Sequence, residues 1–401
     1  MKIAYLHDYF TTPKGSSGTR SYEFSKRLVE CGHEVSILCT NHDRFFHEKK
    51  AFTRDTRELS IDGFKVIQFN VPYSNKLSFN QRMIAFLKQS YLSVKYLVKN
   101  DFDIVYASSP PISSGLTAII YKIFKRKKII FEIRDSWPEV PIKLKVLKNP
   151  VIIFLSKILE KLIYNYSSAF VVLSPGAGER IRELGFKKKE IVLIPNGCDT
   201  DFFKPVILKS FGNINAVYFG AHGYANGLDY VINFSKWLKE NKTDKDIEIN
   251  IHLIGDGMLK ESLILEASNN NIDNIFFHDP VPKSDLPLYL KKIKANVGLQ
   301  LLRNEKVFYH GTSPNKFFDY LSLGLPVINN YQGWVADMIS ENKLGFFVSH
   351  DSFDKLYEAF ILLSYKDTQL ECSKNARSFA EIHFSRNLLF NRLKKLIENI
   401  L

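Results

Sequence analysis

The sequence has 401 residues, of which 45% are hydrophobic and 24% are charged. This composition is ordinary for a folded protein, argues against disorder, and at this length favours two or three domains. The four Cys are scattered and lack a CxxC spacing, which argues against a disulfide framework and a zinc ribbon. Polar residues come too early for a signal peptide, and no apolar run is long enough to cross a bilayer, so we expect a cytoplasmic protein.

The formal net charge is +13, and much of the excess lies in one segment of the first half. Residues 63–131 contain eleven Lys or Arg and two acids. Such an excess predicts an anionic partner, which leaves nucleic acid, a membrane surface and an anionic substrate as the open classes.

Short apolar segments alternate with segments of helical pattern along the first half of the chain. A helix is expected over 20–30, where Phe24 and Leu28 share one side and Gly32 ends the helix. The expected strands are 2–7, 35–39, 64–69, 103–107, 128–133, 169–173 and 191–194. This alternation is typical of a doubly wound parallel sheet.

The alternation starts again after the turn at Asn196-Gly197. The second series of expected strands is 215–219, 249–254, 274–277, 295–301, 326–329 and 345–348. We therefore predict an α/β protein with two Rossmann-like, doubly wound domains that face each other across a cleft. They would span residues 1–198 and 199–384, and a basic amphipathic helix over 385–401 would pack back on the first domain.

Three glycine-rich turns follow apolar strands, at 15–18, 220–227 and 255–257. Glycine lets the backbone approach a phosphate closely, and the helix N-terminus behind such a turn favours an anion. None of the turns matches GxGxxG or GxxxxGK[ST], which disfavours a dinucleotide dehydrogenase and a P-loop nucleotidase. Their place after strands in both domains predicts a ligand in the cleft.

The segment 311–327 is the most specific feature of the sequence. Pro314-Asn315 begins a helix whose N-terminal amides can meet an anion, and Lys316 adds a cation there. Asp319 shares a helix face with Lys316, and its carboxylate can accept hydrogen bonds from both hydroxyls of a ribose. Alternatively, the two residues form a surface ion pair, which would contribute little.

These motifs resemble the retaining nucleotide-sugar glycosyltransferases of GT-B fold, of the family 4 type, nearly from end to end. The residues that carry the resemblance are Gly18, Glu23-Phe24, 32–35, 131–139, 172–176, 194–199, 220–227, 254–257 and 311–326. The most similar branch contains the fucosamine transferases of O-antigen and capsule assembly. The resemblance implies that the first domain binds the acceptor and the second binds a UDP-sugar, whose sugar is an N-acetylated hexosamine or deoxyhexosamine.

The resemblance also implies roles for individual residues. The donor-binding candidates are Gly18, Gly220, His222, Gly223, Asn226, Gly255, Val281, Arg303, Thr312, Ser313, Asn315, Lys316 and Asp319. The catalytic candidates are Asp135, Lys316 and Arg134, and the acceptor-binding candidates are His7, Asp135 and Trp137. Asp135 either orients the acceptor hydroxyl or caps the segment before Trp137.

The chain departs from the family pattern at several positions. Asp319 stands where the family has the second Glu of its Glu-x7-Glu motif, whereas Gly311 stands where the first would be. Ala221 and Asn226 stand where the family often has Arg and Lys to hold the diphosphate. Lys316 and backbone amides would therefore have to make more of the contacts with the diphosphate.

The resemblance implies a reaction that retains the anomeric configuration and needs no cofactor and no metal. We find no Asp-x-Asp placed to hold a divalent ion on the diphosphate. Positive charge and amide dipoles can instead stabilise the leaving nucleoside diphosphate. In the family, the acceptor hydroxyl attacks on the face that the leaving group vacates, and a donor phosphate oxygen takes its proton.

The basic segment has three interpretations. Residues 75–100 mix Lys and Arg with apolar residues and contain no acid, which is typical of an interfacial helix on anionic lipid. We favour peripheral contact with the inner face of the cell membrane through 76–99 and 122–128, where a lipid-linked glycan acceptor would be found. The alternatives are a solvated basic face and a nucleic-acid surface, and no recognition motif supports nucleic acid.

The leading hypothesis is thus a glycosyltransferase of bacterial surface polysaccharide assembly. A sugar-nucleotide epimerase on the same fold is a second candidate, although Gly311 counts against it because that chemistry needs acids around the sugar. A third candidate is a basic membrane- or nucleic-acid-binding protein that kept the fold and lost turnover. Donor binding without transfer to any acceptor would support this third candidate.

Overall fold

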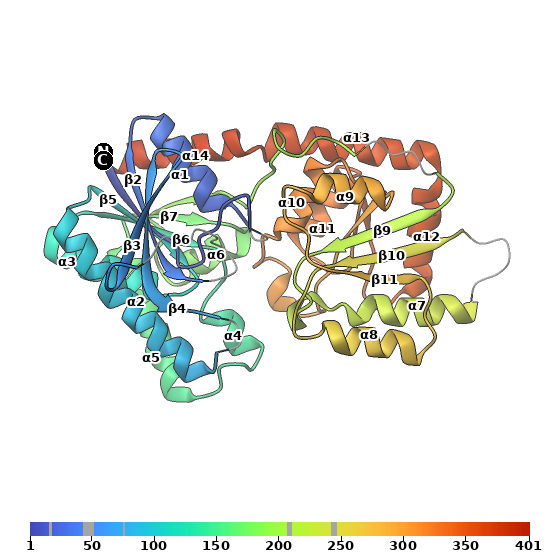
Figure 1. The fold of residues 1–401 in the computed structure, drawn as a ribbon, viewed down its shortest axis with the longest axis horizontal. Coiled ribbons are helices and arrows are strands. Elements are labelled where there is room, and N and C mark those ends of the chain that lie inside the picture. The colour runs from blue at the N-terminus through green and yellow to red at the C-terminus, as the bar shows by residue number, and fades with distance from the viewer. Residues whose placement is uncertain (16–17, 43–51, 75–76, 207–210, 242–246) are drawn as a thin grey trace. The chain divides into compact units, whose positions relative to one another are not determined.

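The computed structural model describes residues 1–15, 18–42, 52–74, 77–206, 211–241 and 247–401. The chain divides into two compact units. Unit 1 comprises Met1–Pro195, Gly311–Ser313 and Asn387–Leu401, and unit 2 comprises Asn196–His310 and Pro314–Arg386. Figure 1 shows unit 1 mainly in blue and green and unit 2 mainly in yellow and orange.

Unit 1 is built on an eight-stranded sheet with the strand order β3-β4-β2-β1-β5-β6-β7-β8. Its strands are β1 (Lys2–Leu6), β2 (Glu34–Asn41), β3 (Thr56–Ile61), β4 (Phe64–Pro72), β5 (Ile104–Ser109), β6 (Lys128–Ile133), β7 (Ala169–Val172) and β8 (Glu190–Leu193). All neighbours are parallel except β3 and β4, which form an antiparallel hairpin. The sequence-based strands do not include β3, although Asp62-Gly63 is a hairpin signal and both residues have positive φ.

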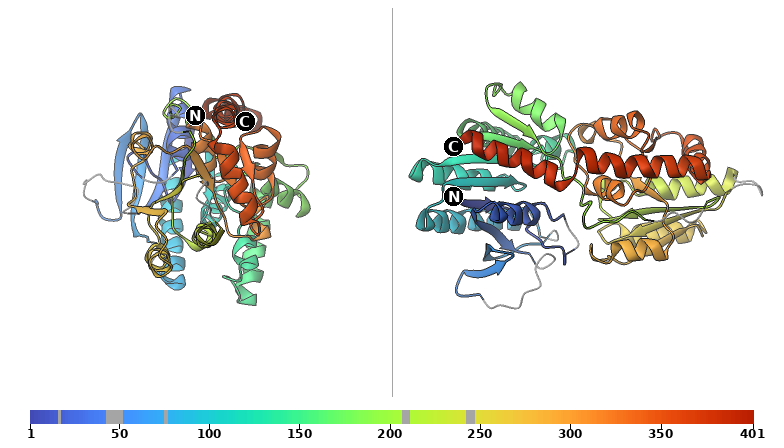
Figure 2. Two further views of the ribbon diagram at one scale, coloured as in Figure 1. Left: turned by 90° about the vertical axis from the view of Figure 1, so that its right-hand side faces the viewer. Right: turned by 90° about the horizontal axis from the view of Figure 1, so that it is seen from above.

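Helices cover both faces of this sheet. They are α1 (Arg20–Glu30), α2 (Phe79–Asn100), α3 (Ser113–Lys125), α4 (Glu139–Lys143), α5 (Pro150–Tyr166), α6 (Pro175–Glu183) and α14 (Arg386–Ile400). Side chains alternate along the strands, so Ile3 and Tyr5 pack with α1 and α14, whereas Ala4 and Leu6 pack on the opposite face. Met1 and Ile400 border the same core cluster, and the two termini lie at the same end of unit 1 (Figures 1 and 2).

Unit 2 is built on a six-stranded parallel sheet with the order β11-β10-β9-β12-β13-β14. Its strands are β9 (Ile214–Phe219), β10 (Ile249–Ile254), β11 (Ile275–His278), β12 (Val297–Gln300), β13 (Val327–Asn329) and β14 (Gly345–Phe347). Its helices are η1 (Tyr224–Asn226), α7 (Asp229–Asn241), α8 (Lys260–Asn269), α9 (Leu286–Lys292), η2 (Lys306–Phe308), α10 (Asn315–Ser322), α11 (Trp334–Glu341), α12 (Phe353–Ser364) and α13 (Lys366–His383). In Figure 1, α7 and α8 lie on one face of the sheet, and α9 and α10 lie on the other.

The prediction of two doubly wound α/β domains is therefore confirmed. In each sheet the strand order reverses at one point, between β1 and β5 in unit 1 and between β9 and β12 in unit 2. Ligands of such sheets bind outside the carboxyl ends of the strands at this point. The loops that follow these four strands are therefore the expected positions of ligand-binding residues in each unit.

Candidate functional site

Two glycine-rich turns of unit 2 pack against each other after β9 and β10. The Gly220 amide donates to the carbonyl of Ile254 at 2.9 Å, and the His222 amide donates to the carbonyl of Asp256 at 2.9 Å. A Cβ on Gly257 would lie 2.5 Å from the His222 carbonyl oxygen, so only glycine fits there. The two turns therefore form one backbone surface at the edge of the sheet.

Lys316, in the first turn of α10, reaches this surface. Its Nζ lies 3.4 Å from Oδ1 of Asn226 and 4.8 Å from the ring centroid of Tyr218. Nζ also lies 3.4 Å from the place that a Cβ on Gly220 would occupy. Burial lowers the pKa of Lys316 to about 8, partly opposed by Asp319. Among the described residues no carboxylate lies within ion-pair distance of Lys316, so its ammonium is available to a bound anion.

Arg303 places a second cation after β12, across the reversal point from β9. Its backbone amide donates to the carbonyl of Ala225 at 3.0 Å, and its guanidinium stacks 3.8 Å from the ring centroid of Tyr224. Its Nη2 lies 3.4 Å from Asp229, while its Nε is buried without a hydrogen-bond partner in the described part of the chain. The structure thus brings together Arg303, Lys316 and Asn226, three of the residues that the sequence nominates.

His222 lies fully buried between the two turns. Burial, and then Lys260, lower its pKa to about 4, so the ring is neutral at physiological pH. Neither ring nitrogen has a hydrogen-bond partner among the residues that the structure describes. Buried polar atoms without partners are rare, and they indicate a place for water or a ligand group.

Asp319 belongs to a buried ion-pair network. Its Oδ1 accepts from Nζ of Lys283 at 3.0 Å, and the same Nζ donates to Asp199 at 2.8 Å. Asp199 is in turn paired with Arg386. Burial alone would raise the pKa of Asp199, but Arg386 and Lys283 hold it below its usual range. The sequence pairs Asp319 with Lys316, whereas the structure pairs it with Lys283, which sequence reasoning missed.

The other donor candidates have the following places. Gly223, Asn226 and Gly255 lie in the two packed turns, and Asn315 is the first residue of α10. Val281 lies in the loop between β11 and α9, close in sequence to Lys283. Gly18 precedes α1, and Thr312 and Ser313 are assigned with it to unit 1. Lys283 could have been nominated from the sequence, because it lies with Val281 in the loop that follows the strand β11.

In unit 1, His7 follows β1 and is hydrogen-bonded through both ring nitrogens. Its Nδ1 lies 2.7 Å from Oγ of Ser21, and its Nε2 contacts the guanidinium of Arg134. Because a guanidinium only donates, Nε2 accepts and the ring proton is on Nδ1. Burial, and then Arg134, lower the pKa of His7 well below its usual range, so the ring is neutral. His7 therefore positions Arg134 rather than offering a free nitrogen to an acceptor.

The remaining residues after β1 and β6 differ in burial. Asp135 follows Arg134 on the surface, and its carboxylate has no hydrogen-bond partner in the described ranges. Trp137 is half-buried. Asp8 is buried, its Oδ2 lacks a partner among the described residues, and burial raises its pKa to about 7. Sequence reasoning did not nominate Asp8, although it directly follows His7 at the reversal point of the sheet.

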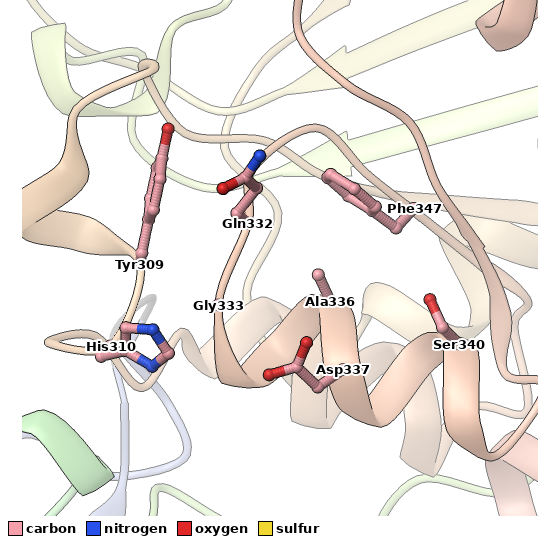
Figure 3. A pocket seen from close by; sticks show the side chains of 8 residues that line it. All are labelled: Tyr309, His310, Gln332, Gly333, Ala336, Asp337, Ser340 and Phe347. Carbon is pink, nitrogen blue, oxygen red and sulfur yellow. The ribbon is translucent and has the colours of Figure 1, made fainter.

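Unit 2 also carries a pocket of about 330 Å³ near the carboxyl ends of β13 and β14 (Figure 3). Its lining residues are Tyr309, His310, Gln332, Gly333, Ala336, Asp337, Ser340 and Phe347. Figure 3 shows Asp337 and Ser340 projecting from α11, with Gln332 and Tyr309 across the space. Such a mixture of hydroxyl, amide and carboxylate groups beside an aromatic ring suits a polyhydroxylated ligand. No group of three or more His, Cys, Asp or Glu in the described chain is arranged to hold a metal ion.

The basic segment is less uniform than its sequence indicates. Lys125 and Lys127 form ion pairs with Asp101 at 3.4 and 3.7 Å, and Lys127 also pairs with Asp103. Lys122 donates to the carbonyl of Tyr166. These contacts reduce the positive charge that the three lysines present to a partner, and the membrane contact predicted for 122–128 stays a prediction. Lys76 lies outside the described residues.

Helix α2 has an exposed face that combines apolar and basic side chains. Its exposed apolar side chains are Met83, Ile84, Leu87 and Tyr91, and the exposed lysines Lys88, Lys95 and Lys99 accompany them. None of the helices in the described ranges has the length and apolar character needed to span a bilayer.

The chain is similar to two glycosyltransferase families and to several solved enzymes. Residues 17–202 match the family described as Glycosyltransferase Family 4, and residues 200–379 match Glycosyl transferases group 1. No curated protein matches the chain. Sucrose-phosphate synthase from Thermosynechococcus elongatus is 15% identical, with a TM-score of 0.78 over 100% of this chain and 98% of that one.

Two further solved structures cover both chains completely. The lipopolysaccharide outer core galactosyltransferase WaaB is 17% identical with a TM-score of 0.64 over 100% of each chain. Anabaena HepE in complex with UDP-glucose is 12% identical with a TM-score of 0.68, again over 100% of each chain. At these identities the likeness shows the fold. The two family matches together cover residues 17–379, and the chain therefore belongs to the glycosyltransferases of GT-B fold.

Proposed function

We propose that this glycosyltransferase transfers a sugar from UDP to a hydroxyl of a lipid-linked glycan, with retention of the anomeric configuration and without a metal ion. The observation that carries the donor side is the ammonium of Lys316, which lies beside the Gly220 turn without a carboxylate in ion-pair distance among the described residues. A half-buried cation of this kind is stabilised when a diphosphate binds. The HepE complex with UDP-glucose supports UDP as the nucleotide.

The donor would be held by the residues after β9, β10 and β12. The diphosphate would contact Lys316 and the amides of Ala221 and Gly223, because the Gly220 and His222 amides already bond the second turn, with Arg303 as a second cation. Asp319 would accept from a ribose hydroxyl, held in place by Lys283. The pocket beside His310 would receive the sugar, which we propose to be N-acetylated, as in the fucosamine-transferase branch.

In the proposed reaction the acceptor oxygen bonds to the anomeric carbon while the bond from that carbon to the β-phosphate oxygen breaks. The acceptor proton passes to a β-phosphate oxygen, so no protein base is required. Lys316 and Arg303 would stabilise the negative charge that develops on the departing UDP. In unit 1, Asp135 and Arg134 would orient the acceptor, with His7 holding Arg134.

The acceptor side of the proposal rests on the surface of unit 1. A lipid-linked acceptor requires an enzyme at the membrane, and the exposed face of α2 combines apolar side chains with lysines. The likeness to WaaB, a lipopolysaccharide galactosyltransferase, is compatible with a role in O-antigen or capsule assembly at the inner face of the cell membrane.

Calorimetric titration with UDP, GDP and ADP tests the donor proposal, in the presence of EDTA and then with Mg²⁺. We expect selective binding of UDP that does not change when the metal is added. Absence of binding by any of the three nucleotides would refute the diphosphate site at Lys316. Slow hydrolysis of a bound UDP-α-sugar, followed by proton NMR, tests retention, because a retaining enzyme first releases the α-anomer.

A further inference from the structure

Helix α5 carries apolar residues on both of its faces. Ile163 and Tyr164 are buried against the sheet, and a Cβ on Gly115 of α3 would lie 2.6 Å from Cδ1 of Ile163, so the two helices are in close contact. The opposite face is exposed and is also apolar. It consists of Val151, Phe154, Leu155, Ile158 and Leu162, whose spacing places them on one helical stripe.

The exposure of this stripe is large for apolar side chains. Val151 and Phe154 are 62% and 63% exposed, and Val146, in the loop before α5, is 76% exposed. Single exposed apolar residues are normal on protein surfaces, but a continuous stripe that begins in a loop and follows a helix is not. Such a stripe indicates an interaction surface.

The charges around the stripe are of one sign. Residues 143–162 contain five lysines and one acid, Glu160. Glu160 is buried and pairs with Arg180 at 3.2 Å, so it does not oppose the lysines at the surface. Lys145, Lys148, Lys157 and Lys161 are exposed and have no ion-pair partner among the described residues.

We infer that the stripe of α5 and the loop before it, residues 143–162, form a membrane-docking surface that inserts apolar side chains into an anionic bilayer. The proposal commits to a lipid surface because exposed lysines flank the apolar stripe, as in helices that lie in the headgroup region. A protein partner would leave four unpaired lysines to be neutralised by acids of its own. This membrane-docking inference rests on the proposed function, because an enzyme that acts on a lipid-linked acceptor must work at a membrane.

The position of α5 suits this role. Helix α3 packs between α2 and α5, and the helices α2 and α5 extend to the same side of unit 1 (Figures 1 and 2). With the exposed face of α2, the docking surface would have two helices rather than the single one that the sequence indicates. The lysines of 122–128 are not needed for it.

Sedimentation with vesicles tests the inference without requiring turnover. The full-length protein is mixed with vesicles of phosphatidylcholine alone or of phosphatidylcholine with phosphatidylglycerol. We expect binding to the anionic vesicles that weakens with salt. The double variant Phe154→Glu/Leu155→Glu should lose about tenfold or more of the partition coefficient, because two apolar side chains no longer enter the lipid.

A matched control replaces two exposed apolar side chains of unit 2 by Glu. Leu265 and Leu288 are 62% and 74% exposed, and Leu265→Glu/Leu288→Glu should leave vesicle binding close to that of the unaltered protein. Lys148→Glu/Lys157→Glu should remove the preference for anionic vesicles while leaving the apolar stripe intact. This second pair keeps the test decisive if circular dichroism shows that the Phe154 variant does not fold.

Three results would overturn the inference: no binding of the unaltered protein to anionic vesicles, equal binding by all variants, or a dimer that only the Phe154 variant dissociates. The last result would mean that a second copy of the chain covers α5. Titration with UDP separates this inference from the donor proposal. A variant that binds UDP normally but vesicles poorly has lost the docking surface and kept the donor site. If the unaltered protein does not bind UDP, the donor proposal fails, and the vesicle result still stands.

Discussion

Lys316 and Asn226 meet at 3.4 Å although 90 residues separate them in the chain. The family resemblance expects cations at positions 221 and 226, where this chain has Ala221 and Asn226. The structure brings a lysine to the same place from α10 instead. The positive charge beside the Gly220 turn is thus kept, but a different element supplies it.

Replacing Lys316 by Met should weaken UDP binding by about tenfold to a hundredfold, the usual effect of losing a charge-assisted hydrogen bond. Calorimetric titration measures this change. Lys236→Met is the matched control, because Lys236 pairs with Glu266 at 2.7 Å on the surface of α7 and α8. Equal UDP affinity of the Lys316 variant and the control would remove Lys316 from the donor site.

The same variant should be more stable than the unaltered protein when no nucleotide is present. Burial lowers the pKa of Lys316 from 10.5 to about 8, so the folded state disfavours its charge at pH 7. Removing that charge should raise Tm at pH 7, and the gain should shrink as the pH rises from about 8 to 10.5, because the penalty disappears only when the unfolded lysine is neutral too. Thermal unfolding across this pH range checks this, and a lower Tm at pH 7 would contradict it.

Lys283→Ala should destabilise unit 2 by about 3–5 kcal/mol, because it leaves the carboxylates of Asp199 and Asp319 buried with one cation fewer. Lys343→Ala removes an exposed pair with Glu371 and should cost about 1 kcal/mol or less. Urea unfolding of both variants gives the comparison. Similar losses in the two variants would mean that the buried network contributes no more than a surface pair.

Asp8→Asn should make the protein more stable at pH 8 and change little at pH 4. Burial raises the pKa of Asp8 from 3.8 to about 7, so the folded carboxyl keeps its proton to a higher pH than the unfolded one. Stability therefore falls by about 1.4 kcal/mol for each pH unit between about 4 and about 7. Denaturant unfolding as a function of pH measures this loss, which the Asn variant should lack.

Gly298→Ala should destabilise unit 2 by about 1–3 kcal/mol through overpacking. A Cβ at this position in β12 would lie 2.5 Å from Cγ of Tyr320, a buried ring whose hydroxyl lies 3.1 Å from the carbonyls of both Val217 and Leu299 and shares its one proton between them. Gly178→Ala is the control, because a Cβ there would meet nothing closer than 3.6 Å and Ala favours a helix. The two variants should shift Tm in opposite directions.

The fold class and most strands could be predicted because buried parallel strands are short apolar runs, and glycine-rich turns mark their carboxyl ends. The hairpin of β3 was missed because Thr56–Ile61 is polar and lies at the edge of the sheet. Lys316, Arg303 and Asn226 could be predicted as donor-site residues from the resemblance to the family's motifs, and the structure brings these three residues together.

The ion-pair partners of charged side chains could not be predicted from their spacing in the sequence. Asp319 lies one helical turn from Lys316, yet it pairs with Lys283 because the order of the strands brings the loop after β11 to α10. Lys125 and Lys127 form a basic run in the sequence, but the end of α2 supplies Asp101 to both.

The sequence by itself determined which segments are apolar, where the turns are, and hence the two doubly wound sheets. Only the tertiary structure decided which apolar faces are covered and which charges are paired. Helix α5 illustrates the physical reason: it has apolar residues on two opposite faces, and only the positions of its neighbours leave Phe154 and Leu155 exposed while Ile163 is buried. Burial and ion pairing depend on residues that are distant in the chain, so the local sequence pattern cannot predict either of them.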